Sequence, residues 1–228
     1  MSSFIVIDGT DGSGKGTQTK KLVERLQAEG RPVKLFDFPR YGNPSAYFVE
    51  KYLRGEYGNA SDVGAFRASL FYALDRYDAS FDIRRELDAG TIVISNRYVS
   101  ASKGHQMGKI TDPEQRLSFL RWLNELEYKI CGIPKPDMTV LLHVPAEIGY
   151  ELVAKKDERG YLDGKKRDIH EADPEHLRAA ETAYLELPKI DREERWTILE
   201  CTENGQLLSI NEIHERLWKV VMGAVRML

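Results

Sequence analysis

Short apolar segments alternate along the chain with longer segments in which apolar residues recur at helical spacing. Segments typical of β-strands occur at residues 4–7, 33–38, 91–95, 139–144 and 195–199. Four of the five are almost entirely apolar, as expected for strands that are buried on both faces of a sheet. The pattern therefore predicts an α/β fold in which a five-stranded parallel sheet has helices on both faces.

The segments between these strands contain helix start signals. Residues 17–29 place apolar side chains on one face. An Asp-Pro pair at residues 112–113 begins a second helix, and we expect Leu117, Leu120 and Leu123 to lie on its inward face. Ser209 and Glu212 have the spacing of a capping box at the start of a last helix.

Composition and charge narrow the class of protein. The chain has 228 residues, of which 42% are hydrophobic and 30% charged, and we expect residues 1–228 to form one globular domain. The net charge of −3 argues against nucleic-acid binding. Residues 4–7 begin a strand at once, with no signal-like segment before them and no apolar run of membrane-spanning length, so we expect a cytoplasmic location and no membrane partner. Cys131 and Cys201 are isolated and indicate neither a disulfide nor a zinc site.

A glycine-rich segment, GTDGSGK at residues 9–15, lies between the first predicted strand and the first predicted helix. In this context the pattern G-x-x-x-x-G-K is typical of a loop whose backbone N–H groups surround phosphate at a helix N-terminus. We expect Lys15 to reach the β- and γ-phosphates of ATP. The predicted ATP-binding residues of the loop are Gly9, Gly12, Ser13, Gly14, Lys15, Gly16 and Thr17.

Gly16 occupies the position at which such loops usually have a Ser or Thr that binds Mg²⁺. A metal ion must then rely more on phosphate oxygens, water and outer-sphere carboxylates, so we predict no direct metal ligand. This difference argues against a GTPase or motor ATPase. The chain also lacks an N-K-x-D guanine-binding motif.

Two arginines follow predicted strands. Arg40 comes soon after the second strand and Arg97 after the third. The carboxyl ends of parallel strands lie at one edge of a sheet, so both guanidinium groups should converge in front of the glycine-rich loop. Arginine binds phosphate in a bidentate manner, and the sequence thus indicates a site for more than one phosphate group. A surface ion pair is the alternative for each arginine taken alone.

Five segments resemble the thymidylate kinase family in their order and spacing. They are GTDGSGKGTQ, FPRYGNP, LFYALDRY, SNRYVSASKGHQ and PKPDMTVLLHV, and the resemblance covers about residues 4–200. It implies the P-loop NTPase fold and an enzyme that transfers the γ-phosphate of ATP to dTMP. It also implies a requirement for Mg²⁺ and a homodimer.

The resemblance implies roles for individual residues. Tyr72 would stack on thymine and Arg76 would bind its O4, and their spacing of four puts both on one helix face. Asp11 would accept a hydrogen bond from the 3′-OH of dTMP. Thr202 would contact adenine. The implied substrate-binding residues are Asp11, Arg40, Tyr72, Arg76, Arg97, Ser102 and His105, and the implied catalytic residues are Lys15, Asn96, Arg97 and Arg167.

Asn96 departs from the family pattern, because most relatives have Asp at this position, where it helps to organise Mg²⁺ and the phosphates. The acceptor phosphate has a second pKa of about 6 and is mostly ionised near neutral pH, so transfer needs no general base. We therefore expect Asn96 to be compatible with turnover.

A charged segment follows the fourth predicted strand. Residues 155–167 include six basic and three acidic residues, and we expect a lid at about residues 155–170. In the family that the chain resembles, an arginine from either the phosphate-binding loop or the lid contacts the transferred group. The loop here contains no arginine, so the resemblance implies that Arg159 or Arg167 in the lid has this role. Arg167 fits the family pattern better than Arg159.

Two other functions remain open. One is a related monophosphate kinase that acts on dUMP, UMP or CMP. Tyr72 and Arg76 would bind any pyrimidine with an O4, so the sequence distinguishes thymine from uracil poorly. A nucleotide-binding regulator without catalysis is suggested by Asn96 and Gly16. The lid and the two arginines argue against that regulator.

Overall fold

The computed structural model describes residues 2–154 and 174–227. The predicted lid, with Arg159 and Arg167, lies outside the described residues.

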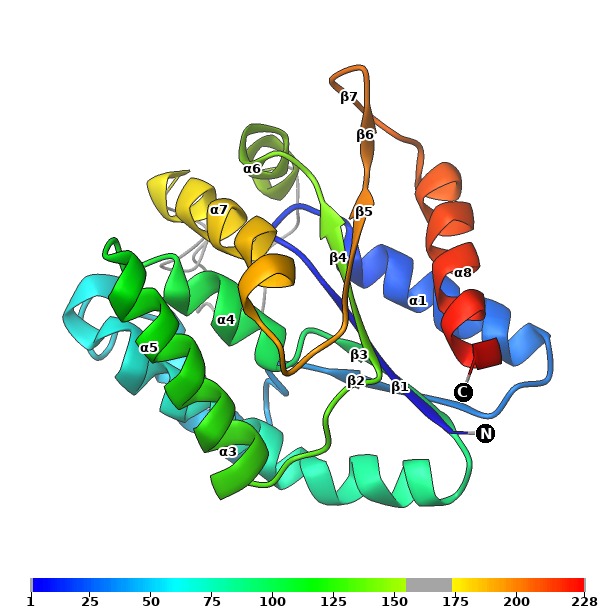
Figure 1. Cartoon of the computed structure of the whole chain (residues 1–228), viewed down its shortest axis with the longest axis horizontal. Helices are drawn as coiled ribbons and strands as arrows, with labels where there is room; N and C mark the ends of the chain where they lie inside the picture. Colours follow the sequence, from blue (N-terminus) through cyan, green and yellow to red (C-terminus); the bar gives the residue numbers. More distant parts are fainter. Residues whose placement is uncertain (1, 155–173, 228) are drawn as a thin grey trace.

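A parallel sheet of five strands forms the centre of the molecule, in the order β2-β3-β1-β4-β5 (Figure 1). The observed strands agree with the predicted ones to within one or two residues, and the predicted fold class is confirmed. A two-stranded antiparallel sheet, β6 and β7, follows β5 and was not predicted. The strands are β1 Ser3–Asp8, β2 Val33–Asp37, β3 Ile92–Asn96, β4 Met138–His143, β5 Trp196–Glu200, β6 Thr202–Glu203 and β7 Gln206–Leu207.

Helices cover both faces of the sheet. Helices α1 and α8 lie on one face, and α3, α4, α5 and α7 lie on the other (Figure 1). A 3₁₀ turn at Pro44–Ala46 precedes α2, and a π-helical turn at Glu125–Ile130 follows α5. The helices are α1 Lys15–Ala28, α2 Tyr47–Leu53, α3 Ala60–Asp88, α4 Val99–Met107, α5 Pro113–Asn124, α6 Ala146–Ala154, α7 Pro174–Ile190 and α8 Ile210–Met227.

The central strand β1 contributes to two hydrophobic cores, because alternate side chains of a strand point to opposite faces. Phe4 and Val6 belong to the core under α3, α4, α5 and α7. Ile5 and Ile7 belong to the core under α1 and α8. Full burial of each such side chain stabilises the fold by about 1.5–3 kcal/mol. The almost entirely apolar segment that predicted this strand is therefore explained.

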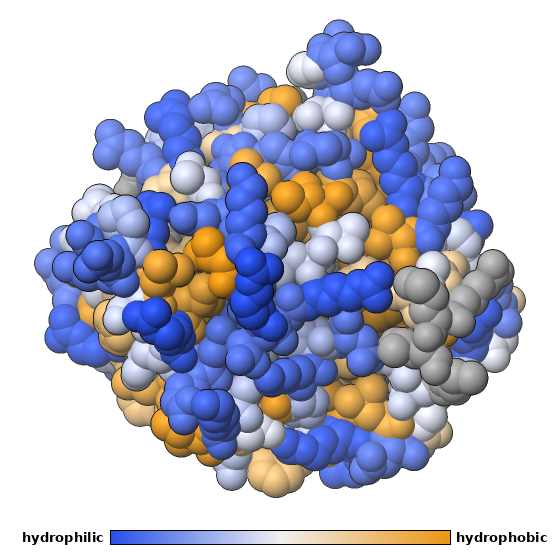
Figure 2. Space-filling model, viewed as in Figure 1, coloured by the Kyte–Doolittle hydropathy of each residue, from blue (hydrophilic) through white to orange (hydrophobic). Residues whose placement is uncertain are grey.

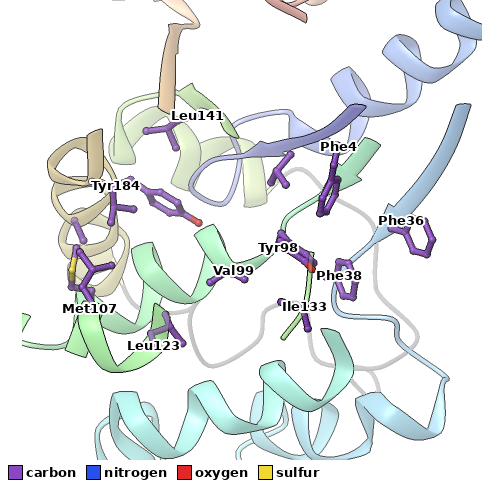
Figure 3. Close-up of a cluster of buried hydrophobic side chains, with 14 of the residues drawn as sticks. Phe4, Phe36, Phe38, Tyr98, Val99, Met107, Leu123, Ile133, Leu141 and Tyr184 are labelled. Carbon is purple, nitrogen blue, oxygen red and sulfur yellow. The ribbon is translucent and has the colours of Figure 1, made fainter. Parts of the chain in front are cut away.

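Tyr98 anchors the chain just after β3. Its ring centroid lies 5.0 Å from that of Phe4 and 5.6 Å from that of Phe38 (Figure 3). Tyr98 is fully buried and directly follows Arg97, whose backbone has a left-handed φ of 64°. Packing of the ring thus fixes the backbone that presents Arg97.

The predicted helix starts are confirmed. The Asp112 carboxylate accepts a hydrogen bond from the backbone N–H of Gln115, at 2.7 Å, and caps α5. Ser209 and Glu212 exchange hydrogen bonds at the start of α8, at 2.9 and 3.3 Å. The predicted burial of Leu120 and Leu123 is confirmed, but that of Leu117 is wrong, because Leu117 is 40% exposed. The buried stripe of α5 is centred on other side chains, and Leu117 lies on the flank of the helix.

The surface seen in Figure 2 is formed mainly by hydrophilic residues, and hydrophobic residues reach it in separate patches. Among the described residues, none of the helices combines the length and apolarity required to span a membrane.

Candidate active site

A cavity of about 440 Å³ lies at the carboxyl ends of β2 and β3, between the glycine-rich loop and helices α3 and α4. It brings together most of the residues that sequence analysis singled out. Those that line it are Asp11, Gly12, Gly14, Lys15, Gly16, Thr17, Tyr72, Arg76, Asn96, Arg97, Ser102 and His105.

The glycine-rich loop is shaped by close backbone contacts. Gly12 has a φ of 86°, and a Cβ added to it would lie 2.1 Å from the carbonyl oxygen of Gly149 in α6. Gly14 has a φ of 79° and forms the N-cap of α1. Because Gly14, Gly16 and Thr17 all line the cavity, the positive end of the α1 dipole faces it.

Lys15 and Arg97 both contact the carboxylate of Asp11. The Lys15 ammonium donates to the carbonyl oxygen of Thr10, at 3.0 Å, and lies 3.4 Å from Asp11 Oδ1. The Arg97 guanidinium donates to the same Oδ1. Burial disfavours the charged form of Arg97, but the carboxylates of Asp11 and Asp8 outweigh this effect and raise the pKa of Arg97 well above its ordinary value. Asp11 thus lies between two basic side chains.

His105 is neutral in this arrangement. Its Nε2 lies 3.1 Å from Arg97 Nη1, and a guanidinium only donates, so Nε2 accepts. The proton then resides on Nδ1, which lies 3.4 Å from His176 Nε2. Burial lowers the pKa of His105 well below its ordinary value, in spite of the opposing effect of Asp11. The His105 side chain therefore fills space at the cavity wall without adding a positive charge there.

Arg76 is fixed from three sides. It is 1% exposed, and its Nε and Nη2 donate to the carboxylate of Glu127, with Nη2 at 2.5 Å from Oε1. Nη2 also donates to Ser102 Oγ, at 2.9 Å, and Nη1 donates to the carbonyl oxygen of Tyr98, at 3.1 Å. Tyr72 lines the same wall one helical turn earlier. Sequence analysis did not find Glu127, because nothing in its local sequence indicates its buried partner.

Arg40 does not line the cavity, contrary to the expectation that it converges with Arg97. Its Nε donates to Asp75 Oδ1 at 2.9 Å, and its Nη2 donates to Asp78 Oδ2 at 2.5 Å and to Ser45 Oγ at 2.7 Å. Both carboxylates belong to α3, so they hold the Arg40 side chain against that helix.

Three further predicted residues also lie outside the cavity lining. Gly9 and Ser13 pack closely against each other inside the loop. A Cβ added to Gly9 would lie 2.7 Å from Ser13 Oγ and 2.5 Å from the carbonyl oxygen of Leu142, so no side chain fits at position 9. Thr202 lies in β6, beyond the end of β5. Thr202 does not line this cavity, so its predicted contact with adenine stays a prediction.

Oxygen atoms near the loop could serve a hard cation such as Mg²⁺. Within residues 2–154 and 174–227, no group of three His, Cys, Asp or Glu side chains is arranged to hold a metal ion. Asp8 is buried and accepts hydrogen bonds from Ser100 Oγ at 2.5 Å and from the Tyr184 hydroxyl at 3.1 Å. Residues with side-chain oxygens that line the cavity near the loop include Asp11, Thr17, Asp37 and Asn96.

Asp37 was missed by sequence analysis, although a signal was present. It is the acidic last residue of a mainly apolar strand, at the edge of the sheet where ligands bind. Partial burial raises the pKa of Asp37, while the Asn96 amide and the charges of Arg97 and Lys15 act to lower it.

Comparison with known proteins identifies the family. The family model described as Thymidylate kinase matches residues 7–213. The chain belongs to the thymidylate kinase family. The thymidylate kinase of Mycobacterium tuberculosis is 33% identical over 197 residues, which cover 86% of this chain and 90% of that protein. The thymidylate kinase of Syntrophotalea carbinolica is 30% identical over 238 residues and covers 100% of this chain and 98% of that protein.

A solved structure supports the fold independently. The thymidylate kinase from Candida albicans has a TM-score of 0.72 and 21% sequence identity, and covers 97% of this chain and 92% of that chain. The predicted family and the P-loop NTPase fold are thus confirmed. Family membership makes the chain an ATP-dependent nucleoside monophosphate kinase.

Proposed function

We propose that this chain transfers the γ-phosphate of ATP to dTMP, giving dTDP and ADP. An oxygen of the dTMP phosphate attacks the γ-phosphorus, and the bond from that phosphorus to the β–γ bridging oxygen breaks. The observation that supports this function best is the shared cavity, in which the lysine of a phosphate-binding loop and the strand-end Arg97 both contact Asp11. Two cations around one central carboxylate suit two phosphate-bearing substrates.

We assign the ATP phosphates to the glycine-rich loop. Gly12 and Gly14 allow the backbone to turn there, and the N-terminus of α1 contributes positive potential. Lys15 is within the same cavity wall and can move its ammonium from the Thr10 carbonyl oxygen to a phosphate oxygen. When bound with ATP, Mg²⁺ would neutralise part of the phosphate charge, and its requirement here is part of the proposal.

We assign the acceptor phosphate to Arg97 and its sugar to Asp11. Binding of that phosphate by Arg40 would require its guanidinium to leave Asp75 and Asp78. We therefore give Arg40 a positioning role on α3 instead. His105, which is neutral and buried, occupies space beside Arg97 and is suited to exclude a ribose 2′-OH.

We assign the thymine base to Tyr72, Arg76 and Ser102. The ion pair with Glu127 holds the Arg76 guanidinium in one orientation at the cavity wall. A donor fixed in advance loses little conformational freedom when a base oxygen binds, so Arg76 is suited to read O4.

The lid and the domain organisation stay predictions from the sequence. We propose that residues 1–228 form one kinase domain, that residues 155–170 close over ATP, and that Arg167 contacts the transferred group. We also propose a cytoplasmic location, which is likewise a prediction from the sequence.

We propose a homodimer formed through the outer face of α3. Large apolar side chains recur on this helix at intervals of three or four residues, and five of them are between 42% and 54% exposed. Such a stripe is typical of a face that packs against another helix. The stripe consists of Phe66, Leu70, Leu74, Tyr77 and Phe81. Sedimentation equilibrium of the wild type should give twice the chain mass, and Leu74→Glu should give the monomer mass.

Two alternatives compete with the proposal. A kinase for dUMP, UMP or CMP would use the same phosphate groups, and a 5-methyl group adds only about 1 kcal/mol of apolar contact. A nucleotide-binding regulator would bind both substrates without transfer. Phosphorus NMR of the full chain with ATP, dTMP and Mg²⁺ tests the proposal against the regulator. We expect the signals of dTDP and ADP to grow together, and unchanged ATP and dTMP would contradict it.

A further inference from the structure

Asp37 and Asn96 form a pair at the edge of the sheet that faces the phosphate-binding loop. They are the last residues of β2 and β3 and lie opposite each other in the strand register. The Nδ2 of Asn96 donates a hydrogen bond to Oδ1 of Asp37, at 2.8 Å. Both residues line the cavity.

The chemistry of this pair fixes the orientation of the amide. A carboxylate only accepts hydrogen bonds, so the NH₂ group of Asn96 must face Asp37 and its oxygen must face the other way. That oxygen, Oδ1, is buried and has no hydrogen-bond partner among the described residues. A buried amide oxygen to which no group donates can coordinate a cation directly, or can accept a hydrogen bond from a water bound to that cation.

The surroundings of Asp37 point to the same kind of ligand. Asp37 is an exposed residue that lines the cavity, and no ion pair joins it to a basic side chain within residues 2–154 and 174–227. Partial burial raises the pKa of Asp37 on balance, while the hydrogen bond from Asn96 and the charges of Arg97 and Lys15 act in the opposite direction. An anionic group beside bound phosphates repels them unless a cation lies between. Hard carboxylate and amide oxygens next to phosphates are typical ligands of hydrated Mg²⁺.

We propose that the carboxylate of Asp37 is the acidic group that this chain offers to the Mg²⁺ of bound ATP, and that Asn96 is a positioning residue that orients it. The inference rests on the proposed function. The inference also accounts for the amide of Asn96, because a carboxylate at position 96 would face that of Asp37 at hydrogen-bonding distance and repel it. The pair therefore carries one negative charge, which lies on β2 at Asp37 and not on β3 at position 96.

Metal binding without turnover tests this proposal. The probe is Mn²⁺ detected by electron paramagnetic resonance, titrated into the full chain with a non-hydrolysable ATP analogue. Asp37→Asn should weaken Mn²⁺ binding about tenfold or more, whereas Asp88→Asn, at the exposed end of α3, should stay within about twofold of wild type. The double variant D37N/N96D returns a carboxylate to the pair and should recover most of the loss. An Asp37→Asn affinity within about twofold of wild type would overturn the proposal.

A second measurement uses only the wild type, so it does not depend on how the variants fold. Fe²⁺ with ascorbate and hydrogen peroxide cleaves a backbone near a bound metal ion. With ADP present, we expect cleavage at residues 36–38, suppressed by excess Mg²⁺. Cleavage confined to other segments would contradict the proposal.

The outcomes separate this inference from the proposed function. If dTMP is phosphorylated and Asp37→Asn binds Mn²⁺ as the wild type does, the role of Asp37 is wrong and the kinase activity stands. If Asp37→Asn loses the metal and dTMP is no substrate, the metal site stands and the proposed acceptor is wrong.

Discussion

The guanidinium of Arg97 and the carboxylate of Asp11 form an ion pair across the candidate active site, although they are 86 residues apart in the sequence. Arg97 is presented by the end of β3, and Asp11 by the glycine-rich loop after β1. Lys15 approaches the same carboxylate oxygen from the loop side. Asp11 therefore lies between the cation that we assign to ATP and the one that we assign to dTMP.

Replacing Asp11 by Asn tests its proposed contact with the acceptor sugar. Loss of a charged acceptor for the 3′-OH costs about 1.5–3 kcal/mol, so the KM for dTMP should rise about tenfold or more, while the KM for ATP changes much less. Steady-state kinetics with each substrate varied in turn measure both values. A 3′-deoxy analogue of dTMP should be a poor substrate of the wild type. Equal effects on the two KM values would show that Asp11 does not distinguish the acceptor.

Replacing Gly12 by Ala tests the close approach of the loop to α6. The added Cβ would meet the backbone of Gly149 and would sit at a left-handed φ, so we expect a loss of stability of about 1–3 kcal/mol. Gly16→Ala is the matched control, because a Cβ there has nothing within 4 Å and lies in a helix. That change should stabilise the chain by up to about 1 kcal/mol. Urea unfolding measures both, and a Gly12→Ala variant as stable as Gly16→Ala would refute the contact.

Replacing Glu127 by Ala removes the partner of a buried guanidinium. Arg76 would keep its charge without compensation, so the free energy of unfolding should fall by about 3–5 kcal/mol. Glu125 provides the control, because its pair with Lys129 is exposed and Glu125→Ala should change stability by less than about 1 kcal/mol. Denaturant unfolding at neutral pH distinguishes the two. A small loss for Glu127→Ala would mean that the ion pair does not hold Arg76.

His143 predicts a pH dependence of stability. Burial acts to lower its pKa, but the carboxylates of Glu181 and Glu200, at 2.8 and 2.6 Å from its two ring nitrogens, outweigh burial and raise it. The folded state therefore binds the proton more tightly than the unfolded state, whose pKa is about 6.5. This contribution is fully present below about pH 6.5 and is lost as the pH rises through the folded-state pKa.

The variant His143→Gln isolates that contribution. The difference in unfolding free energy between wild type and variant should be largest near pH 6 and should shrink near pH 9. Denaturant unfolding at several pH values measures it. If the difference in unfolding free energy instead grew with pH, the pKa of His143 would be lowered by folding, contrary to the prediction.

The sheet and the loop could be predicted because their signals are local. Each strand is a short apolar segment, and the glycine-rich loop is contiguous between β1 and α1. The same holds for Tyr72 and Arg76, whose spacing puts them on one helix face.

Pairings between distant segments could not be predicted in the same way. Whether Arg40 points into the cavity or against α3 depends on the position of Asp75 and Asp78, which pattern analysis does not give. The partner of Arg76 is likewise set by the packing of a π-helical turn that carries Glu127. Residues of this kind are found only when the elements are placed in three dimensions.

The central claim is that dTMP is the preferred acceptor. A coupled assay of ADP release, with ATP and Mg²⁺ and a series of monophosphates, measures kcat/KM for each one. The account predicts the highest kcat/KM for dTMP, a lower value for dUMP, and much lower values for UMP and CMP. A higher kcat/KM for UMP or CMP than for dTMP would contradict it.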